Sequence, residues 1–458
     1  MRKVASPLIT LTLLAFPFAL RARQNDVSQR AEPRRLLLEA SLLIKDIPDF
    51  QQYSATANIA GQLVRAGDLA DALAIVSTLK KPEDQTRGIG IIAWQVAHAG
   101  NFAQALALIE NSPDNVEKEV SYETLAQLRA VSGDFVTALQ IAHRIRNDPN
   151  RLAETLARLA SLQAKAGDSA GAREIIVEAL TIAEEATHEN IGHATIFPQI
   201  ATTQAEIGDV SGAYNTLDRF SGIAHQASNK DEFLRWLAEA QAQIGDNADA
   251  ERTEGEIHGG NYDIALLRTA QTQAAHGLID EATKGVARMS TSAWKNSALR
   301  EIAMIQGTHG TLNEALATIN LIAEPTARME ALATLALEQA DNKNPEAGFT
   351  LQAATEMASE MGANTPENVL GTIAVTHGIL GEFAAAERIV NGLSKPESRT
   401  WPLWNITEYL ASAGRVQEAV ELAESQDEPE AKAYALLGTS TGIMDRIADE
   451  EKARTGKK

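Results

Sequence analysis

The 458-residue chain contains no cysteine, which excludes disulfides, thiolate metal sites and a lipid-modified cysteine anchor. Aromatic residues make up only 5% of it, so alanine and aliphatic side chains must supply most of the interior. Lysine and arginine number 41 against 61 acidic residues, giving a formal net charge of −20 without any basic cluster. Nucleic-acid binding relies on such clusters, so we expect no nucleic-acid partner. The acidity agrees with solubility, basic partners or divalent cations without choosing among them.

Motifs that carry chemistry are also scarce. Gly438–Gly442 (GTSTG) matches the G-x-S-x-G serine motif, but that motif needs a strand before the serine, and the context here is helical. His188 and His193 are five residues apart, a spacing that points two rings to different faces of a helix. No P-loop lysine motif or dinucleotide-binding glycine pattern occurs. We therefore expect no catalytic residues, no metal site and no cofactor.

What the chain does contain is a repeat with a spacing of 32 to 41 residues. Each copy has an anchor residue followed five residues later by alanine, which indicates stacked supersecondary units. The anchors are Gly67, Gly100, Gly133, Gly167, Gly208, Gly245, Gly277, Gly310, Asn342, Gly381 and Gly414. The alanines are Ala72, Ala105, Ala138, Ala172, Ala213, Ala250, Ala282, Ala315, Ala347, Ala386 and Ala419. Glycine and asparagine tolerate a left-handed backbone, so the anchor position predicts φ > 0.

Each copy reads as a helical hairpin because both sides of the anchor show helical spacing and no alternating strand pattern occurs. The anchor would end the first helix, and an Asp, Asn or Thr directly after it in seven copies would cap the second helix. Prolines 13 to 16 residues past several anchors would end the second helix. The two longest copies, before Gly208 and before Gly381, predict extended second helices.

Two columns of the repeat describe its packing. The place eight residues before the anchor is Ile or Leu except at Thr269 and Thr334, and the next place is nearly always alanine. Alanine there and five residues past the anchor predicts close approach of the two helices. A glutamine column four residues before the anchor has two open interpretations: a structural ladder between units, or amides that grip an extended peptide. Its members are Gln163, Gln204, Gln241, Gln273 and Gln306.

These offsets resemble the tetratricopeptide repeat, in which small residues flank a Gly-Asp turn. The resemblance covers residues 47–427, although the family's usual aromatic in the first helix is replaced by the glutamine column. It implies an all-α fold: a right-handed superhelical solenoid of about eleven hairpins, with a concave groove lined by first helices. Residues 23–46 and 428–458 would be an N-terminal capping helix and a C-terminal capping helix with a tail. Such a groove holds a protein or peptide.

The first 22 residues differ from the rest. A basic start at Met1–Lys3 precedes 17 uncharged residues, Val4–Leu20, which is typical of an export signal. Residues 1–22 are therefore predicted to be a signal peptide, and the protein to be periplasmic or secreted. An uncleaved membrane anchor is the alternative, and it would be the chain's only membrane contact. Removing residues 1–22 deletes three basic residues and leaves a net charge of −23.

In the resembled family, three places of the first helix point into the groove, and we expect the partner-binding residues there. They are Arg87, Trp94, Arg235, Arg300, Trp401 and Trp404. Trp and Arg are enriched in binding hot spots, although the same side chains could fill gaps between units. Trp401 and Trp404 would form a patch near a helix start, with Pro402 in the first turn. We expect a non-catalytic scaffold; the alternative is an exported enzyme or enzyme subunit with groove carboxylates and a displaced pKa.

Overall fold

The structure is a computed structural model that describes residues 30–46, 49–309 and 312–455. These residues are helical and repeat-like, without a strand among them, and they form two compact units. Unit 1 joins the residues up to Lys80 with those from His377 onward, and unit 2 is Lys81–Thr376. The predicted signal peptide lies outside the described residues. Among the residues that are described, no helix is long and apolar enough to span a membrane.

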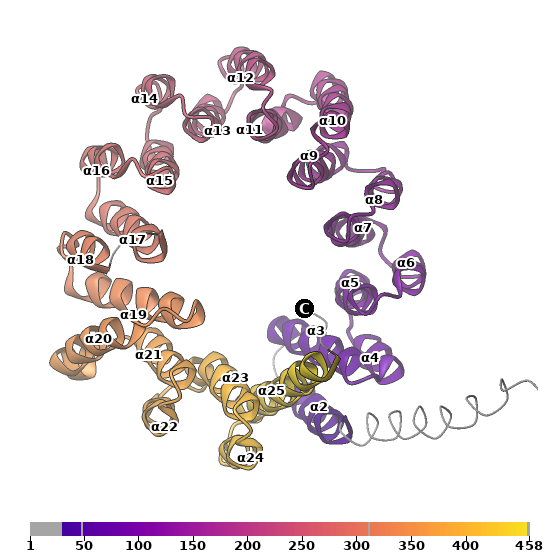
Figure 1. The fold of residues 1–458 in the computed structure, drawn as a ribbon, viewed down its shortest axis with the longest axis vertical. Coiled ribbons are helices and arrows are strands. Elements are labelled where there is room, and N and C mark those ends of the chain that lie inside the picture. Colours follow the sequence, from indigo (N-terminus) through magenta and orange to yellow (C-terminus); the bar gives the residue numbers. More distant parts are fainter. Residues whose placement is uncertain (1–29, 47–48, 310–311, 456–458) are drawn as a thin grey trace, which may run out of the picture. The chain divides into compact units, whose positions relative to one another are not determined.

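Helices alternate along the repeat as first and second members of each copy (Figure 1). The first helices are α3 (Asp49–Arg65), α5 (Pro82–His98), α7 (Asn115–Val131), α9 (Pro149–Lys165), α11 (Phe197–Glu206), α13 (Lys230–Gln243), α15 (Gly260–Ala275), α17 (Ser292–His309), α19 (Pro325–Asp341), α21 (Glu367–Ile379) and α23 (Pro396–Ser412). The second helices are α4 (Leu69–Val76), α6 (Phe102–Glu110), α8 (Phe135–Ala142), α10 (Ser169–Glu189), α12 (Val210–Ala224), α14 (Asn247–Glu254), α16 (Ile279–Arg288), α18 (Leu312–Ile319), α20 (Ala347–Met361), α22 (Phe383–Gly392) and α24 (Val416–Glu424). Outside this alternation are α2 (Ala31–Leu43), α25 (Pro429–Thr455) and the 3₁₀ turns η1 (Ile44–Asp46), η2 (Ile191–Ile196) and η3 (Gly362–Asn364).

The turn inside each copy follows from its glycine and its capping residue. Every anchor glycine in the described residues has φ between 79° and 98°. The side chain of the following residue accepts a hydrogen bond from the backbone N–H three residues on, which satisfies a free donor of the second helix. The capping residues that do this are Asp68, Asn101, Asp134, Asp168, Asp209 and Asp246. The expected cap at Thr311 lies outside the described residues.

The copy without an anchor glycine differs from the expectation. Asn342 has φ −81°, and the left-handed residue is Lys343, with φ 56°. The first helix of this copy, α19, therefore ends one residue later than the Asn342 alignment predicts. Lysine carries a Cβ atom, so it holds this conformation at a steric cost that glycine avoids.

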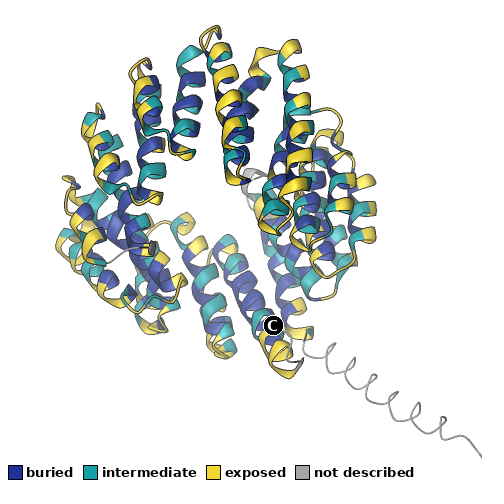
Figure 2. Ribbon diagram, turned by 45° about the horizontal axis from the view of Figure 1, so that its top comes forward, coloured by how far each residue is buried: buried dark blue, intermediate teal, exposed yellow. Residues whose placement is uncertain are grey.

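The alanine column forms the contact between the two helices of a copy. All eleven alanines five residues past the anchor are at most 1% exposed. Figure 2 shows buried residues on the helix sides that face neighbouring helices and exposed residues on the outer sides. Because the interior is built from small side chains, each hairpin is held by close helix approach. The extended second helix predicted before Gly208 is also present, since α10 has 21 residues.

Unit 2 arranges its helices in two rows. The first helices from α5 to α19 lie side by side, each contacting the next, and the second helices from α6 to α20 pack against them on one side (Figure 1). We call the surface of the first helices that faces away from the second helices the first-helix face. Within unit 2 this face is continuous from one copy to the next.

Unit 1 brings the beginning and the end of the described chain into contact. Helix α25 packs against α23 on one side and against α2 on the other. The hydroxyl of Ser440 donates to the carbonyl of Pro33 at 3.2 Å, and Arg65 pairs with Asp445 at 2.5 Å. The two terminal segments, expected to be an N-terminal and a C-terminal cap, thus pack against each other.

Candidate functional site

The first-helix face of α5 carries two of the predicted partner-binding residues. Arg87 forms ion pairs with Asp84 at 3.2 Å and with Glu117 of α7 at 2.6 Å, so it bridges two copies. Trp94 is 37% exposed and stacks on His98, with ring centroids 5.2 Å apart and an interplanar angle of 13°. A large ring held flat at the surface offers contact area with little conformational entropy left to lose.

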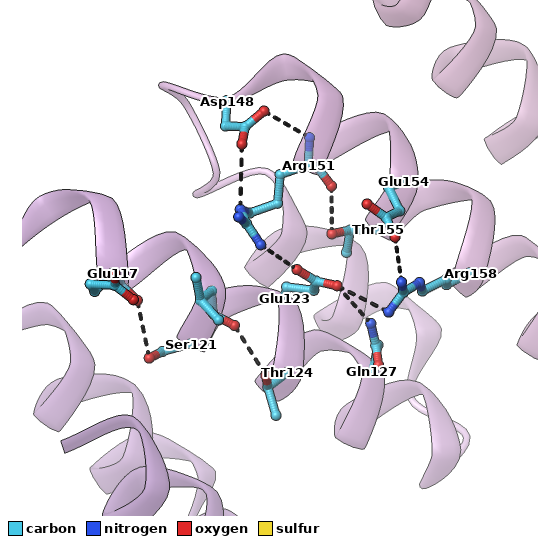
Figure 3. Close-up of polar contacts among 11 residues, drawn as sticks. Glu117, Ser121, Glu123, Thr124, Gln127, Asp148, Arg151, Glu154, Thr155 and Arg158 are labelled. Atoms are coloured by element: carbon cyan, nitrogen blue, oxygen red, sulfur yellow. Dashed lines mark hydrogen bonds and ion pairs between the residues drawn. The ribbon is translucent and has the colours of Figure 1, made fainter. Parts of the chain in front are cut away.

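The next two first helices are joined by a charged network that the sequence analysis missed. Arg151 and Arg158 of α9 converge on the carboxylate of Glu123 in α7, at 2.8 and 3.2 Å (Figure 3). Gln127 donates to the same carboxylate at 3.3 Å, and Asp148 pairs with Arg151 at 3.6 Å. The Glu123 side chain is only 13% exposed. Glu123 stands ten residues before Gly133, in the same column as Arg235 and Arg300. Its position in the repeat could therefore have identified it as a candidate site residue.

The two other predicted arginines of unit 2 have different roles. Arg300 of α17 lies 3.4 Å from the Glu330 carboxylate of α19, again joining consecutive first helices. Arg235 of α13 instead covers the ring of its neighbour Trp236, with 5.0 Å from the guanidinium carbon to the ring centroid. Its Nε atom is buried without a hydrogen-bond partner. Arg235 is therefore partly a packing residue, whereas Arg87 and Arg300 belong to the polar first-helix face.

Only one of the two tryptophans in the predicted patch on α23 is exposed. Trp401 is 44% exposed, but Trp404 is half-buried and packs against Tyr434 of α25, with centroids 5.9 Å apart. The expectation for Pro402 is wrong: α23 begins at Pro396, so Pro402 lies inside the helix rather than in its first turn. The helix therefore begins a turn and a half earlier than predicted, and Trp404 is a midhelix residue that contacts α25.

Beside Trp404 lies an acidic group that the sequence analysis did not single out. The pKa of Glu408 is raised to about 7, first by burial and then by the negative charge of Asp445. The Trp404 indole and Arg65 oppose this rise, although the buried indole N–H makes no hydrogen bond of good geometry. Asp445 itself is held by Arg65 of α3 at 2.5 Å. These residues all belong to unit 1, where α3, α23 and α25 meet.

Four of the five column glutamines bond within their own copy. The amide oxygens of Gln204, Gln241 and Gln306 accept hydrogen bonds of 2.6 to 2.7 Å from threonine hydroxyls of the second helix in the same copy. Those threonines are Thr216, Thr253 and Thr318. The Gln163 amide instead donates to the capping Asp168 at 2.6 Å. These four contacts lie within a copy, whereas the Gln273 amide donates to Asn247 of the preceding copy at 3.1 Å, as a ladder between units would.

The serine motif of α25 is a packing device. A Cβ atom on Gly438 would lie 2.0 Å from the backbone oxygen of Trp404, and one on Gly442 would lie 2.1 Å from that of Glu408. The two glycines therefore let α25 approach the α23 backbone closely, while the fully buried Ser440 faces α2. The motif sits inside a helix, without the preceding strand that the serine motif needs.

Taken together, these contacts give the first-helix face of unit 2 paired charges and a presented tryptophan. Such a surface can exchange its half-exposed ion pairs for contacts to a polar or charged partner at modest cost. Within the described ranges, no three His, Asp or Glu side chains gather closely enough to hold a metal ion.

Comparison with known proteins places the chain in no family. No family model and no curated protein matches it. Among solved structures, it is similar to Ton1535 from Thermococcus onnurineus NA1, with 17% identity over 84% of this chain and 99% of that one and a TM-score of 0.29. A circular tandem repeat protein with novel repeat topology and enhanced subunit contact surfaces has 16% identity over 94% of this chain and 99% of its own, with a TM-score of 0.15.

Proposed function

We propose that the protein is a non-catalytic scaffold that holds a protein or peptide on its first-helix face. The proposal includes the finer architecture expected from the sequence: about eleven tetratricopeptide-like hairpins stacked into a right-handed superhelix. The turn glycines, the capping aspartates and the buried alanine column support it. Export to the periplasm or the exterior remains part of this proposal, and amino-terminal sequencing of the natively produced protein tests it.

The observation that carries the proposal is the surface presentation of Trp94. Only five tryptophans occur in the chain, and this one remains 37% exposed on α5, the helix whose Arg87 pairs with Glu117 of the next first helix. An aromatic anchor with a polar rim is the usual anatomy of a protein-binding hot spot. Trp401 offers a second anchor of the same kind in unit 1.

The test compares wild-type protein with Trp94→Ala and Trp401→Ala. Partners are captured from the native exported fraction, identified, purified and titrated against each variant. We expect either substitution to weaken binding by about 2 kcal/mol with an unchanged melting temperature. Val136→Ala on α8 is the control, because Val136 is 70% exposed but belongs to a second helix. Unchanged affinity in both tryptophan variants would refute the proposal.

A second candidate function rests on Glu408. A carboxyl group with a pKa of about 7 beside a second carboxylate suits general acid catalysis near neutral pH. Catalysis also requires that a substrate reach the group. Modification by a water-soluble carbodiimide with an amine nucleophile tests this, since an accessible Glu408 would be labelled as fast as the exposed Glu387. Protection of Glu408 in the folded protein would favour the scaffold instead.

A further inference from the structure

A hollow of about 210 Å³ opens in unit 2 between α14, α15 and α16. At its wall stands Glu254, the last residue of α14, which is 3% exposed. One Glu254 oxygen accepts a hydrogen bond of 2.5 Å from Thr269 of α15, and the other lies 3.0 Å from a guanidinium nitrogen of Arg288. Glu254 is thus a buried charged group at the edge of an open space.

Glu254 departs from the repeat. It stands nine residues after Gly245, and at that place the other ten copies all have an apolar residue. Those residues are Val76, Ile109, Ala142, Ile176, Leu217, Val286, Ile319, Leu351, Val390 and Ala423. Burial raises the pKa of Glu254, while Thr269 and Arg288 lower it. A carboxyl group at a core position costs stability, so its presence calls for a reason beyond packing.

Two more departures line the same hollow. Thr269 is one of only two residues other than Ile or Leu at its core place. Gly285 stands eight residues after Gly277, where the other copies have an Ile, Leu or Thr side chain; these are Ile75, Leu108, Ile141, Ile175, Thr216, Thr253, Thr318, Thr350, Ile389 and Leu422. A Cβ atom on Gly285 would meet only Ala270, at 3.9 Å, so the space beyond it is empty.

Because Gly285 has no side chain, the Gln273 amide has no hydroxyl partner at that place in its own copy. In three other copies the column glutamine accepts a hydrogen bond from the threonine of the second helix, but Gln273 has Gly285 at the corresponding place. Its amide nitrogen donates instead to Asn247 at 3.1 Å, across to the preceding copy. If the Glu254–Arg288 pair served packing alone, the chain would not need to lose a side chain at Gly285. Nor would the Gln273 amide need to bond to Asn247 instead of a threonine in its own copy. The three departures together create an accessible polar space.

The charges at the hollow indicate what it can hold. Glu251, Glu254 and Glu281 face two cations, Lys284 and Arg288, which leaves an excess of one negative charge. Arg288 is shared between Glu254 and Glu251, the latter at 3.4 Å. Each carboxylate oxygen can accept more hydrogen bonds than it receives here. A ligand with several N–H donors and a positive charge would therefore match the walls.

We propose that this hollow binds a small organic cation that bears a guanidinium or primary ammonium group on a short aliphatic chain. The cationic group contacts Glu254 and Glu251, and the amide oxygens of Asn247 and Gln273 accept further hydrogen bonds from it. A volume of about 210 Å³ suits one such group and a few methylenes. The cation could be a free solute or a basic side chain of a polypeptide, which present the same chemistry. This site is separate from the first-helix face and does not depend on the scaffold proposal.

The test is calorimetric titration of the full chain at low ionic strength with L-arginine and with 1,4-diaminobutane. We expect at least one to bind and L-glutamate not to bind. Gly285→Ile places the residue type of other copies into the hollow, so it should weaken binding by about tenfold or more while maintaining or raising the melting temperature. Glu254→Gln should weaken binding by about tenfold or more by removing the charge. Gly222→Ile is the control, because Gly222 lies in α12 with open space around it.

If both free cations fail, an amidated and acetylated Ala-Arg-Ala peptide is titrated in the same way. Binding of this peptide by wild type and its loss in Gly285→Ile would support a polypeptide side chain as the source of the cation. Failure of the free cations and the peptide would overturn the proposal. Equal binding by wild type and Gly285→Ile, or stronger binding of glutamate than of arginine, would also overturn it, since the ligand would then lie elsewhere or carry the opposite charge.

Discussion

The half-buried carboxyl of Glu408 makes the stability of unit 1 depend on pH in a defined direction. Its pKa is raised in the folded protein from an ordinary 4.5 to about 7. The folded state therefore holds a proton that the unfolded chain releases between these two values. Its contribution to stability is present below pH 4.5 and is lost as the pH rises through about 7. The gap between these two pKa values corresponds to about 3 kcal/mol.

Other carboxylates act at lower pH. Hydrogen bonds from the backbone N–H groups of the second helix lower the pKa of the capping Asp134 and Asp168. A lowered pKa gives stability that is present above the unfolded value and lost as pH falls, so these groups titrate below the Glu408 window. The effect of Glu408 can therefore be measured separately from theirs.

The assay is urea unfolding, followed by circular dichroism, at about pH 5 and about pH 8 for wild type and Glu408→Gln. Glutamine keeps the shape but cannot ionise, so its stability relative to wild type should rise by up to about 3 kcal/mol between the two pH values. Comparing the two proteins cancels the titration of histidines. Glu387→Gln, at an exposed site of α22, should show no such change. If the unfolding free energies of wild type and Glu408→Gln differ by the same amount at both pH values, Glu408 is not desolvated and the reasoning is refuted.

Three further predictions concern packing. Ala138→Leu should lower the unfolding free energy by about 1–3 kcal/mol through overpacking of a fully buried site, whereas Val136→Leu on the exposed side of the same helix should be nearly neutral in thermal melts. Thr216→Val should cost about 1–3 kcal/mol because it leaves the buried Gln204 amide without its donor, and the double variant with Gln204→Met should recover most of this loss. Gly442→Ala should destabilise unit 1 more than Gly392→Ala, since only the former meets backbone atoms; equal melting temperatures would contradict this.

The local features of the fold were predictable because their causes lie within a few residues. A left-handed glycine, a capping aspartate and an alanine five residues on identify a helical turn without reference to the rest of the chain. The position of Pro402 was mispredicted because two prolines, Pro396 and Pro402, both suit a helix start, and only the first takes it. Trp404 is half-buried because α25 packs against it, and no pattern within α23 indicates this contact.

The contact between α2 and α25 was beyond sequence reasoning for a related reason. Ser440 and Pro33 are 407 residues apart, and Arg65 and Asp445 are 380 apart. Charged side chains on both terminal segments agreed equally well with solvated caps and with ion pairs between the segments. The raised pKa of Glu408 depends on the same closure, because burial by packed helices is its largest cause. A carboxyl group in the last copy thus becomes perturbed through a contact that only the folded chain contains.

In a repeat array, a residue that differs from the type found at the same position in the other copies can indicate a local function that the shared packing residues do not. Ten copies show what residues satisfy packing at the Glu254 and Gly285 places, so these two residues cannot be explained by packing alone. The same comparison shows that Gln204, Gln241 and Gln306 are bonded inside their own hairpins, whereas Gln273, whose copy has Gly285 in place of the threonine, bonds across to Asn247 at the hollow. Repetition therefore acts as an internal control. The three residues that differ from their columns, Glu254, Thr269 and Gly285, come from two copies and three helices. All three nevertheless line the hollow beside α14, which makes this hollow, rather than the regular columns, the place to look for a ligand.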